Sequence, residues 1–77
     1  MDIQKRVTAV IQSVTEKKLS GDDEESLFES GLLDSFALPD LVSSLEKEFS
    51  IKIPDSDLNP RKFESVARVT AYVESRI

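Results

Sequence analysis

The chain has 77 residues and a formal net charge of −5, with fifteen acidic and ten basic side chains and neither cysteine nor histidine. Its length predicts a single domain over residues 1–77, and the missing residue types exclude a disulfide framework, a thiolate metal site and a histidine-activated nucleophile, so we expect no enzyme activity. The acidic balance argues against nucleic-acid binding; because residues 1–20 lack the apolar core of a signal peptide and no run approaches a membrane span, we expect a cytoplasmic protein without stable membrane insertion.

The first predicted helix covers residues 2–17, where apolar side chains recur at the helical period. This stripe consists of Ile3, Val7, Val10, Ile11 and Val14. The polar run that begins at Ser20 lacks periodicity and predicts a long loop that reaches Asp34, and loops of this length in compact domains are often functional. Four apolar residues should anchor this loop to the core, namely Leu27, Phe28, Leu32 and Leu33.

A second helix is predicted over residues 35–49, because its apolar residues cluster within about 100° of arc. They are Leu38, Leu41, Val42, Leu45 and Phe49. Phe36 falls on the opposite face, so we expect its side chain to be exposed. If Asp34 caps this helix, Pro39 lies beyond the first turn and removes one backbone hydrogen bond. We therefore expect either an irregular first turn or a regular helix that begins a little after Ser35.

Residues 51–54 should form a short extended segment. Residues 55–62 are bounded and interrupted by prolines, which leaves room for one turn or a short helix. A last helix follows a cap at Ser65 and runs to about Arg76, with Tyr72 on its flank. Its apolar stripe consists of Val66, Val69, Val73 and Ile77. The fold is therefore predicted to be all-α, with three main helices and one short helix in a bundle and a long loop between the first and second helices.

The pair Asp34-Ser35 stands at the predicted start of the second helix, where free backbone N–H groups and the positive end of the helix dipole favour an anion. A serine at this place can carry a phosphate-linked group. Asp and Ser are also preferred helix caps, so the pattern alone fits a plain N-cap with no further role. The long loop before the pair and the exposed Phe36 after it favour a function.

Residues 55–60, Asp-Ser-Asp-Leu-Asn-Pro, begin like a calcium-binding loop, with oxygen-bearing side chains at alternate positions. The pattern fails at its sixth position, where Pro60 replaces the required glycine, and at its twelfth, where Val66 replaces a glutamate. The acidic run at residues 22–25 has no metal-ligand spacing and fits a solvated surface. We therefore expect no metal site.

Three segments in the right order resemble the acyl carrier protein family. Residues 27–35, Leu-Phe-Glu-Ser-Gly-Leu-Leu-Asp-Ser, resemble the attachment motif of that family. Residues 45–54 resemble the end of its second helix and the loop beyond, and residues 63–66 resemble the entry to its last helix. The length, acidity and helix order also fit, so the resemblance covers nearly the whole chain and implies a carrier domain.

The resemblance implies that a phosphopantetheinyl transferase attaches 4′-phosphopantetheine from coenzyme A to the hydroxyl of Ser35, giving a monomeric phosphoprotein that carries acyl groups as thioesters. Acyl-loading, synthase or transferase enzymes would be the other partners. Asp34 would cap the helix or position the transferase, and Phe36 would be an apolar contact for partners. Asp40 and Glu46 match acidic recognition positions of the family.

Some residues depart from the pattern of fatty-acid synthesis carriers. Ala37, Ser43 and Lys47 occupy places where those carriers often have acidic residues, and Pro39 is unusual there. The string at residues 31–36 also resembles D-alanyl carrier proteins and stand-alone carriers of specialised pathways. The pathway thus stays open between fatty acid biosynthesis and a D-alanyl or aminoacyl carrier, and a helical interaction module with the serine as a plain N-cap is the alternative outside the carrier class.

Overall fold

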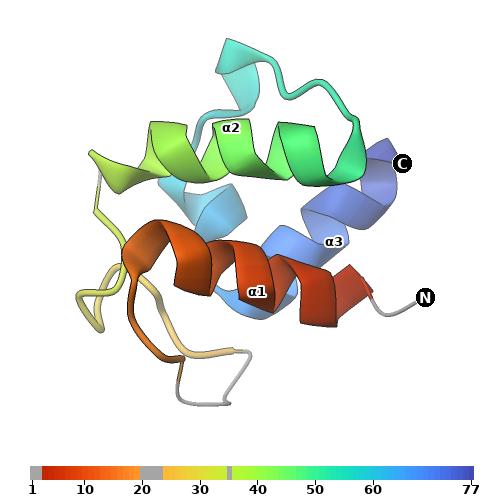
Figure 1. Ribbon diagram of the computed structural model, residues 1–77. Coiled ribbons are helices and arrows are strands. Elements are labelled where there is room, and N and C mark those ends of the chain that lie inside the picture. The colour runs from red at the N-terminus through yellow and green to blue at the C-terminus, as the bar shows by residue number, and fades with distance from the viewer. Residues whose placement is uncertain (1–2, 20–23, 35) are drawn as a thin grey trace.

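The computed structural model describes residues 3–19, 24–34 and 36–77, and in these residues it contains only helices, turns and irregular segments (Figure 1). The helices are α1 (Ile3–Thr15), α2 (Ala37–Phe49) and α3 (Val66–Arg76), and two 3₁₀ turns, η1 (Asp55–Asp57) and η2 (Pro60–Phe63), lie between α2 and α3. α1 packs against both α2 and α3, and η2 packs against α3. The predicted all-α bundle with three main helices is confirmed, and the two 3₁₀ turns take the place of the single short helix.

The core lies between the three helices and holds the apolar stripe of each. Its buried members are Val7, Val10, Ile11, Leu27, Leu33, Leu38, Leu41, Val42, Leu45, Ile53, Phe63, Val66, Val69 and Val73. Ile77 is 55% exposed, so its predicted place in the stripe of α3 is wrong. The N–H of Ile77 still donates to the carbonyl of Val73 at 3.2 Å, but the side chain lies beyond the last helical residue, Arg76, and stays in solvent.

Two helix ends show how local chemistry sets the boundaries. α1 ends at Thr15, two residues before its predicted end, because Glu16 takes a left-handed φ of 56° that stops the helix. α3 begins after Ser65, whose hydroxyl accepts the N–H of Arg68 at 3.2 Å, as predicted for its N-cap. This cap fixes where the last helix starts.

The described part of the loop between α1 and α2, residues 24–34, is tied to the rest of the molecule by its backbone. The N–H of Leu27 donates to the carbonyl of Glu64 at 2.6 Å, and the N–H of Leu33 donates to the carbonyl of Leu27 at 2.9 Å. Gly31 permits the turn between the two leucines, because its φ of 84° favours glycine. The four predicted anchors are confirmed as core contacts: buried Leu27 and Leu33, and half-buried Phe28 and Leu32.

Candidate functional site

The candidate site lies where this loop meets the start of α2. Ser35, the predicted attachment residue, lies outside the described residues, so the geometry comes from its neighbours on either side. Asp34 is exposed at the end of the loop, and Phe36 is exposed immediately before α2. The described residues of the site therefore lie at the surface, at the N-terminal end of α2 (Figure 1).

Asp34 caps α2 with both its side chain and its backbone. Its Oδ1 accepts the N–H groups of Phe36 at 2.9 Å and of Ala37 at 2.8 Å. Its carbonyl oxygen accepts the N–H groups of Ala37 and Leu38, each at 3.1 Å. These bonds satisfy donors that a helix start otherwise leaves without partners. The cap fixes the direction in which the chain enters α2, and a role of Asp34 toward a transferase stays a prediction.

Pro39 does not interrupt α2, because the helix begins at Ala37. The proline is then the third helical residue, within the first turn, where a proline is tolerated better than in the interior of a helix. Of the two possibilities that the sequence left open, the structure agrees with a helix that begins a little after Ser35. The proline has no N–H to continue the ladder that the Leu38–Asp34 bond begins, and its fixed φ suits the first turn next to the site.

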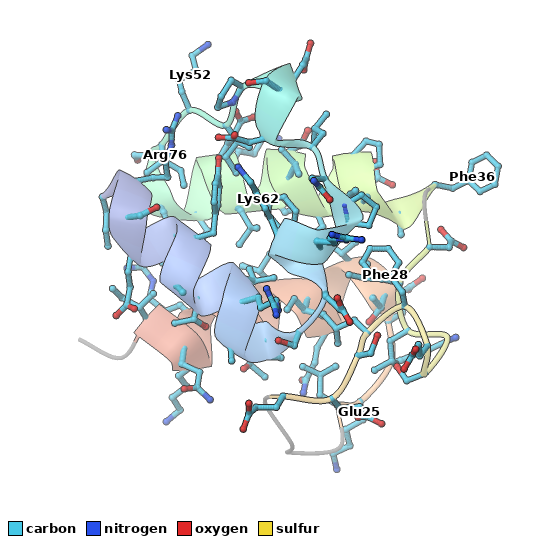
Figure 2. The ribbon with its side chains drawn as sticks, turned by 180° about the vertical axis from the view of Figure 1, so that it is seen from behind. Glu25, Phe28, Phe36, Lys52, Lys62 and Arg76 are labelled. Carbon is cyan, nitrogen blue, oxygen red and sulfur yellow. The ribbon has the colours of Figure 1, made fainter. Side chains whose placement is uncertain are left out.

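Phe36 projects away from the helices at the end of α2 that meets the loop (Figure 2). Its side chain is 88% exposed, which confirms the exposure expected from its place opposite the core stripe. An aromatic side chain this exposed adds nothing to the core, because its apolar area stays in water. Phe28, from the loop, lies toward the same side of the molecule and is half-buried. Contact of Phe36 with partners stays a prediction.

The two acidic positions that the resemblance assigned to partner recognition differ in their surroundings. Asp40 is exposed in the first turn of α2, where its charge also suits the helix dipole. Glu46 is half-buried, and its Oε2 accepts the backbone N–H of Ile53 at 2.8 Å. This bond, which the sequence did not predict, ties the segment after α2 to the helix. Glu46 therefore has a structural role, and recognition by partners stays a prediction for both residues.

The structure also bears on metal and membrane sites. Within residues 3–19, 24–34 and 36–77, no group of three or more Asp, Glu, His or Cys side chains is arranged to hold a metal ion. In the run that resembles a calcium loop, Asp57 instead bonds to Lys62 and Tyr72. Across the same described ranges, no helix has the length and apolar character needed to span a bilayer.

A second group of polar side chains, the Asp57 cluster, comprises Asp57, Lys62, Tyr72 and Arg76. Asp57 accepts from Lys62 Nζ at 2.8 Å and from the Tyr72 hydroxyl at 2.6 Å. These two hydrogen bonds, first that from Lys62, hold the pKa of Asp57 below its ordinary value. Burial, together with the bond to Asp57, raises the pKa of Tyr72 to about 12. The cluster holds η1 and η2 against α3. The sequence indicated it only through Tyr72, which was predicted to lie on the flank of the last helix.

Residues 5–73 match the family described as Phosphopantetheine attachment site. The chain is 32% identical over 77 residues to the D-alanyl carrier protein of Leuconostoc mesenteroides, and the alignment covers 100% of this chain and 99% of that protein. It is 32% identical over 75 residues to the D-alanyl carrier protein of Lactobacillus acidophilus, which covers 97% and 95% of the two chains. It is 29% identical over 82 residues to the acyl carrier protein of Thermotoga maritima, which covers 100% and 99%. These similarities extend from α1 to α3 and include the candidate site.

Proposed function

This chain belongs to the phosphopantetheine-attachment family of carrier proteins, and from that premise we propose that the hydroxyl of Ser35 bears its 4′-phosphopantetheine arm. Members of this family carry the arm covalently and work with phosphopantetheinyl transferases and acyl-handling enzymes. When bound, the arm supplies a thiol that holds an acyl or aminoacyl group as a thioester. The observation that supports this position most is its pair of neighbours, the capping Asp34 and the exposed Phe36.

Two other serines of the loop are less suited to modification. The Ser26 hydroxyl accepts the N–H of Glu29 at 3.2 Å, and the Ser30 hydroxyl donates to the carbonyl of Leu27 at 3.2 Å. Both hydroxyls stabilise the turn of the loop, and modification would remove those bonds. Neither serine stands at the start of α2, where the helix dipole favours the negative charge of a phosphodiester. Position 35 is the one serine of the loop that has this place in the sequence.

We propose that the chain performs no chemistry itself and acts as one monomeric carrier domain in the cytoplasm. There coenzyme A would provide the arm that the transferase attaches. The three helices share one apolar core, which supports a single unit. By tethering the carried group, the protein raises its effective concentration at the active site of a partner. In this proposal Asp34 holds the helix start in place, and Phe36 and Asp40 contact the transferase and the acyl-handling enzymes.

For the cargo we favour D-alanine or another small aminoacyl group. Two of the relatives compared are D-alanyl carrier proteins, and the exposed Ser43 and Lys47 leave the surface of α2 only weakly acidic. Fatty acid biosynthesis is the second candidate, because the Thermotoga relative is an acyl carrier protein. Intact mass after incubation of the modified protein with ATP, D-alanine and a D-alanine–carrier ligase, or with malonyl coenzyme A and a malonyltransferase, separates the two. We expect the alanyl adduct, and a malonyl adduct alone would favour the second candidate.

Intact mass spectrometry also tests the attachment residue. Incubation with coenzyme A and a broad-specificity phosphopantetheinyl transferase should add about 340 Da, the mass of the arm, to the wild-type chain. The gain should vanish in Ser35→Ala and persist in Ser30→Ala, a matched serine of the same loop. Circular dichroism should show both variants folded, because loss of one cap or turn hydroxyl costs about 1 kcal/mol. A gain that survives Ser35→Ala, or no gain in the wild type, would contradict the proposal.

A further inference from the structure

The exposed face of α2 changes the sign of its charge from one end to the other. Phe36, Asp40, Ser43 and Lys47 are all exposed, and their spacing places them on one stripe of the helix. Asp40 lies in the first turn of α2 and Lys47 in the last. A partner that lies along this stripe therefore meets an apolar and an acidic side chain next to the attachment position and a basic one, Lys47, at the far end.

At the basic end, the last turns of α2 and the segment after it enclose a shallow hollow of about 270 Å³, here named the basic hollow. It is lined by Ser43, Glu46, Lys47, Ile51 and Lys52. Lys47 and Lys52 are exposed, and neither forms an ion pair with any residue that the structure describes. Glu46 already uses one carboxylate oxygen for the N–H of Ile53. The hollow thus holds two ammonium groups without an ion pair to any described residue, beside a half-buried isoleucine, against one carboxylate, that of Glu46, which is bonded to the backbone.

Arg76, at the end of α3, adds a third positive charge at this end of α2. Its Nη2 and Nε donate to the carbonyl of Lys52 at 2.9 and 3.3 Å, and Figure 2 shows the two residues near each other, far from Phe36. Asp57, the carboxylate of the neighbouring cluster, is held by Lys62 and by a tyrosine hydroxyl. The helix dipole accounts for a basic residue in the last turn of α2, but Lys52 and Arg76 lie outside that helix.

We propose that the basic hollow is a docking site for an acidic segment of an enzyme that acts on the arm, an inference that rests on the carrier function proposed above. A carboxylate of the partner lies between Lys47 and Lys52, and an apolar side chain next to it covers Ile51. A basic residue of the same partner faces Asp40, about 10 Å away along the helix. Because only one direction along α2 matches both charges, the pairing turns the active site of the partner toward the Phe36 end.

The test uses the unmodified full chain, isotopically labelled on nitrogen, so its outcome does not depend on arm attachment. The probe is a synthetic peptide of alternating glutamate and leucine, and the same peptide with glutamine at each glutamate is the neutral control. In NMR titrations, we expect saturable changes in the amide chemical shifts of residues 43–52 with the acidic peptide and none with the neutral control. They should weaken as salt is added, because the charges involved are exposed.

Charge variants identify the hollow as the binding surface. Lys47→Glu combined with Lys52→Glu should weaken peptide binding by about tenfold, because two attractions become repulsions. The matched control, Lys18→Glu combined with Arg68→Glu, makes the same change of net charge on exposed residues outside the hollow and should stay within about twofold. Lys47→Gln combined with Lys52→Gln removes the charges without reversing them and should also weaken binding, so this variant serves if the charge-reversed one does not fold.

Several results would overturn the inference. Shifts that are absent, that occur equally with the neutral peptide, or that survive the changes at Lys47 and Lys52 would each do so. Binding to phosphatidylglycerol vesicles but not to the peptide would assign the hollow to a lipid headgroup, and shifts that follow protein concentration alone would assign it to a second copy. The mass test of Ser35 is independent of this titration. If no arm were attached but the peptide still bound, the proposed carrier function would be wrong and the docking of an acidic partner would stand.

Discussion

The two ends of α2 are held in different ways. At the N-terminal end, Asp34 caps the backbone and Phe36 stands in solvent. At the C-terminal end, Arg6 from α1 donates to the carboxylate of Glu48 at 2.9 Å and to its carbonyl at 2.7 Å, and its guanidinium lies 4.5 Å from the centroid of the Phe49 ring. One end thus presents side chains to solvent, while the other uses them to join the helix to its neighbours.

This difference fits a carrier whose proposed attachment position lies at the exposed end of α2. Residues that contact partners are best placed on a scaffold whose own contacts are rigid. The bond from Glu46 to Ile53 and the Asp57 cluster extend the side-chain contacts to the segment between α2 and α3. Changes at the exposed residues of the N-terminal end should therefore lower arm transfer more than stability, and changes at the side-chain contacts that join the C-terminal end to its neighbours should do the reverse.

The largest effect should come from Leu33, which anchors the loop directly before the site. Leu33 is 3% exposed, so Leu33→Ala should lower the free energy of unfolding by about 3 kcal/mol, through lost burial and the cavity left behind. That is a large share of the stability of so small a domain. Urea denaturation followed by circular dichroism measures it, and Leu32→Ala, at a half-buried neighbour, should cost less.

Leu33→Ala also tests whether the loop positions the site. The rate of arm transfer to the folded fraction should fall by about tenfold, because a small displacement of a reacting group is costly. The rate is measured by intact mass at a temperature where the variant is folded. An unchanged rate would mean that the loop anchors serve the core alone, which would break the distinction between the two ends.

A smaller effect is expected from the cap. Asp34→Ala removes an acceptor of two backbone N–H groups and should lower the free energy of unfolding by about 1 kcal/mol, with slower arm transfer. Asp34→Asn keeps a capping oxygen and should restore most of the stability. Thermal denaturation and the transfer assay are run on both, with Asp40→Ala as a matched exposed carboxylate in the first turn. If the Asp40 variant lost as much stability, the hydrogen bonds of the cap would not be the cause.

Residues close in the chain account for most of what the sequence predicted. Helical periodicity placed the three helices, and cap chemistry placed the start of α3 at Ser65. The exposure of Phe36 followed from its angle on the second helix. The start of α2 could not be predicted in the same way, because Asp34 and the serine after it are both good caps. The hydrogen bonds of Glu46 and Asp57 escaped prediction because they depend on how irregular segments pack against helices, which no local pattern records.

The smallest effect is expected within the Asp57 cluster. Tyr72→Phe removes the hydroxyl that donates to Asp57 at 2.6 Å and should lower the free energy of unfolding by about 1 kcal/mol or less near neutral pH. We assign the contacts of the Tyr72 hydroxyl to stability and the exposed lysines of the basic hollow to docking, so arm transfer to Tyr72→Phe at neutral pH should match that of the wild type. Slower transfer in the folded variant would contradict that assignment.

The pH dependence of this difference tests whether the fold holds the proton on the Tyr72 hydroxyl. Folding raises the pKa of Tyr72 from its ordinary value of 10.0 to about 12, first through burial and then through the bond to Asp57. A raised pKa means that the contribution of the tyrosine is complete below pH 10.0 and is lost as the pH rises through about 12. The stability advantage of the wild type over Tyr72→Phe should therefore shrink across that window in urea titrations. An advantage that stayed constant there would contradict the raised pKa, because both burial and the bond to Asp57 favour the protonated hydroxyl.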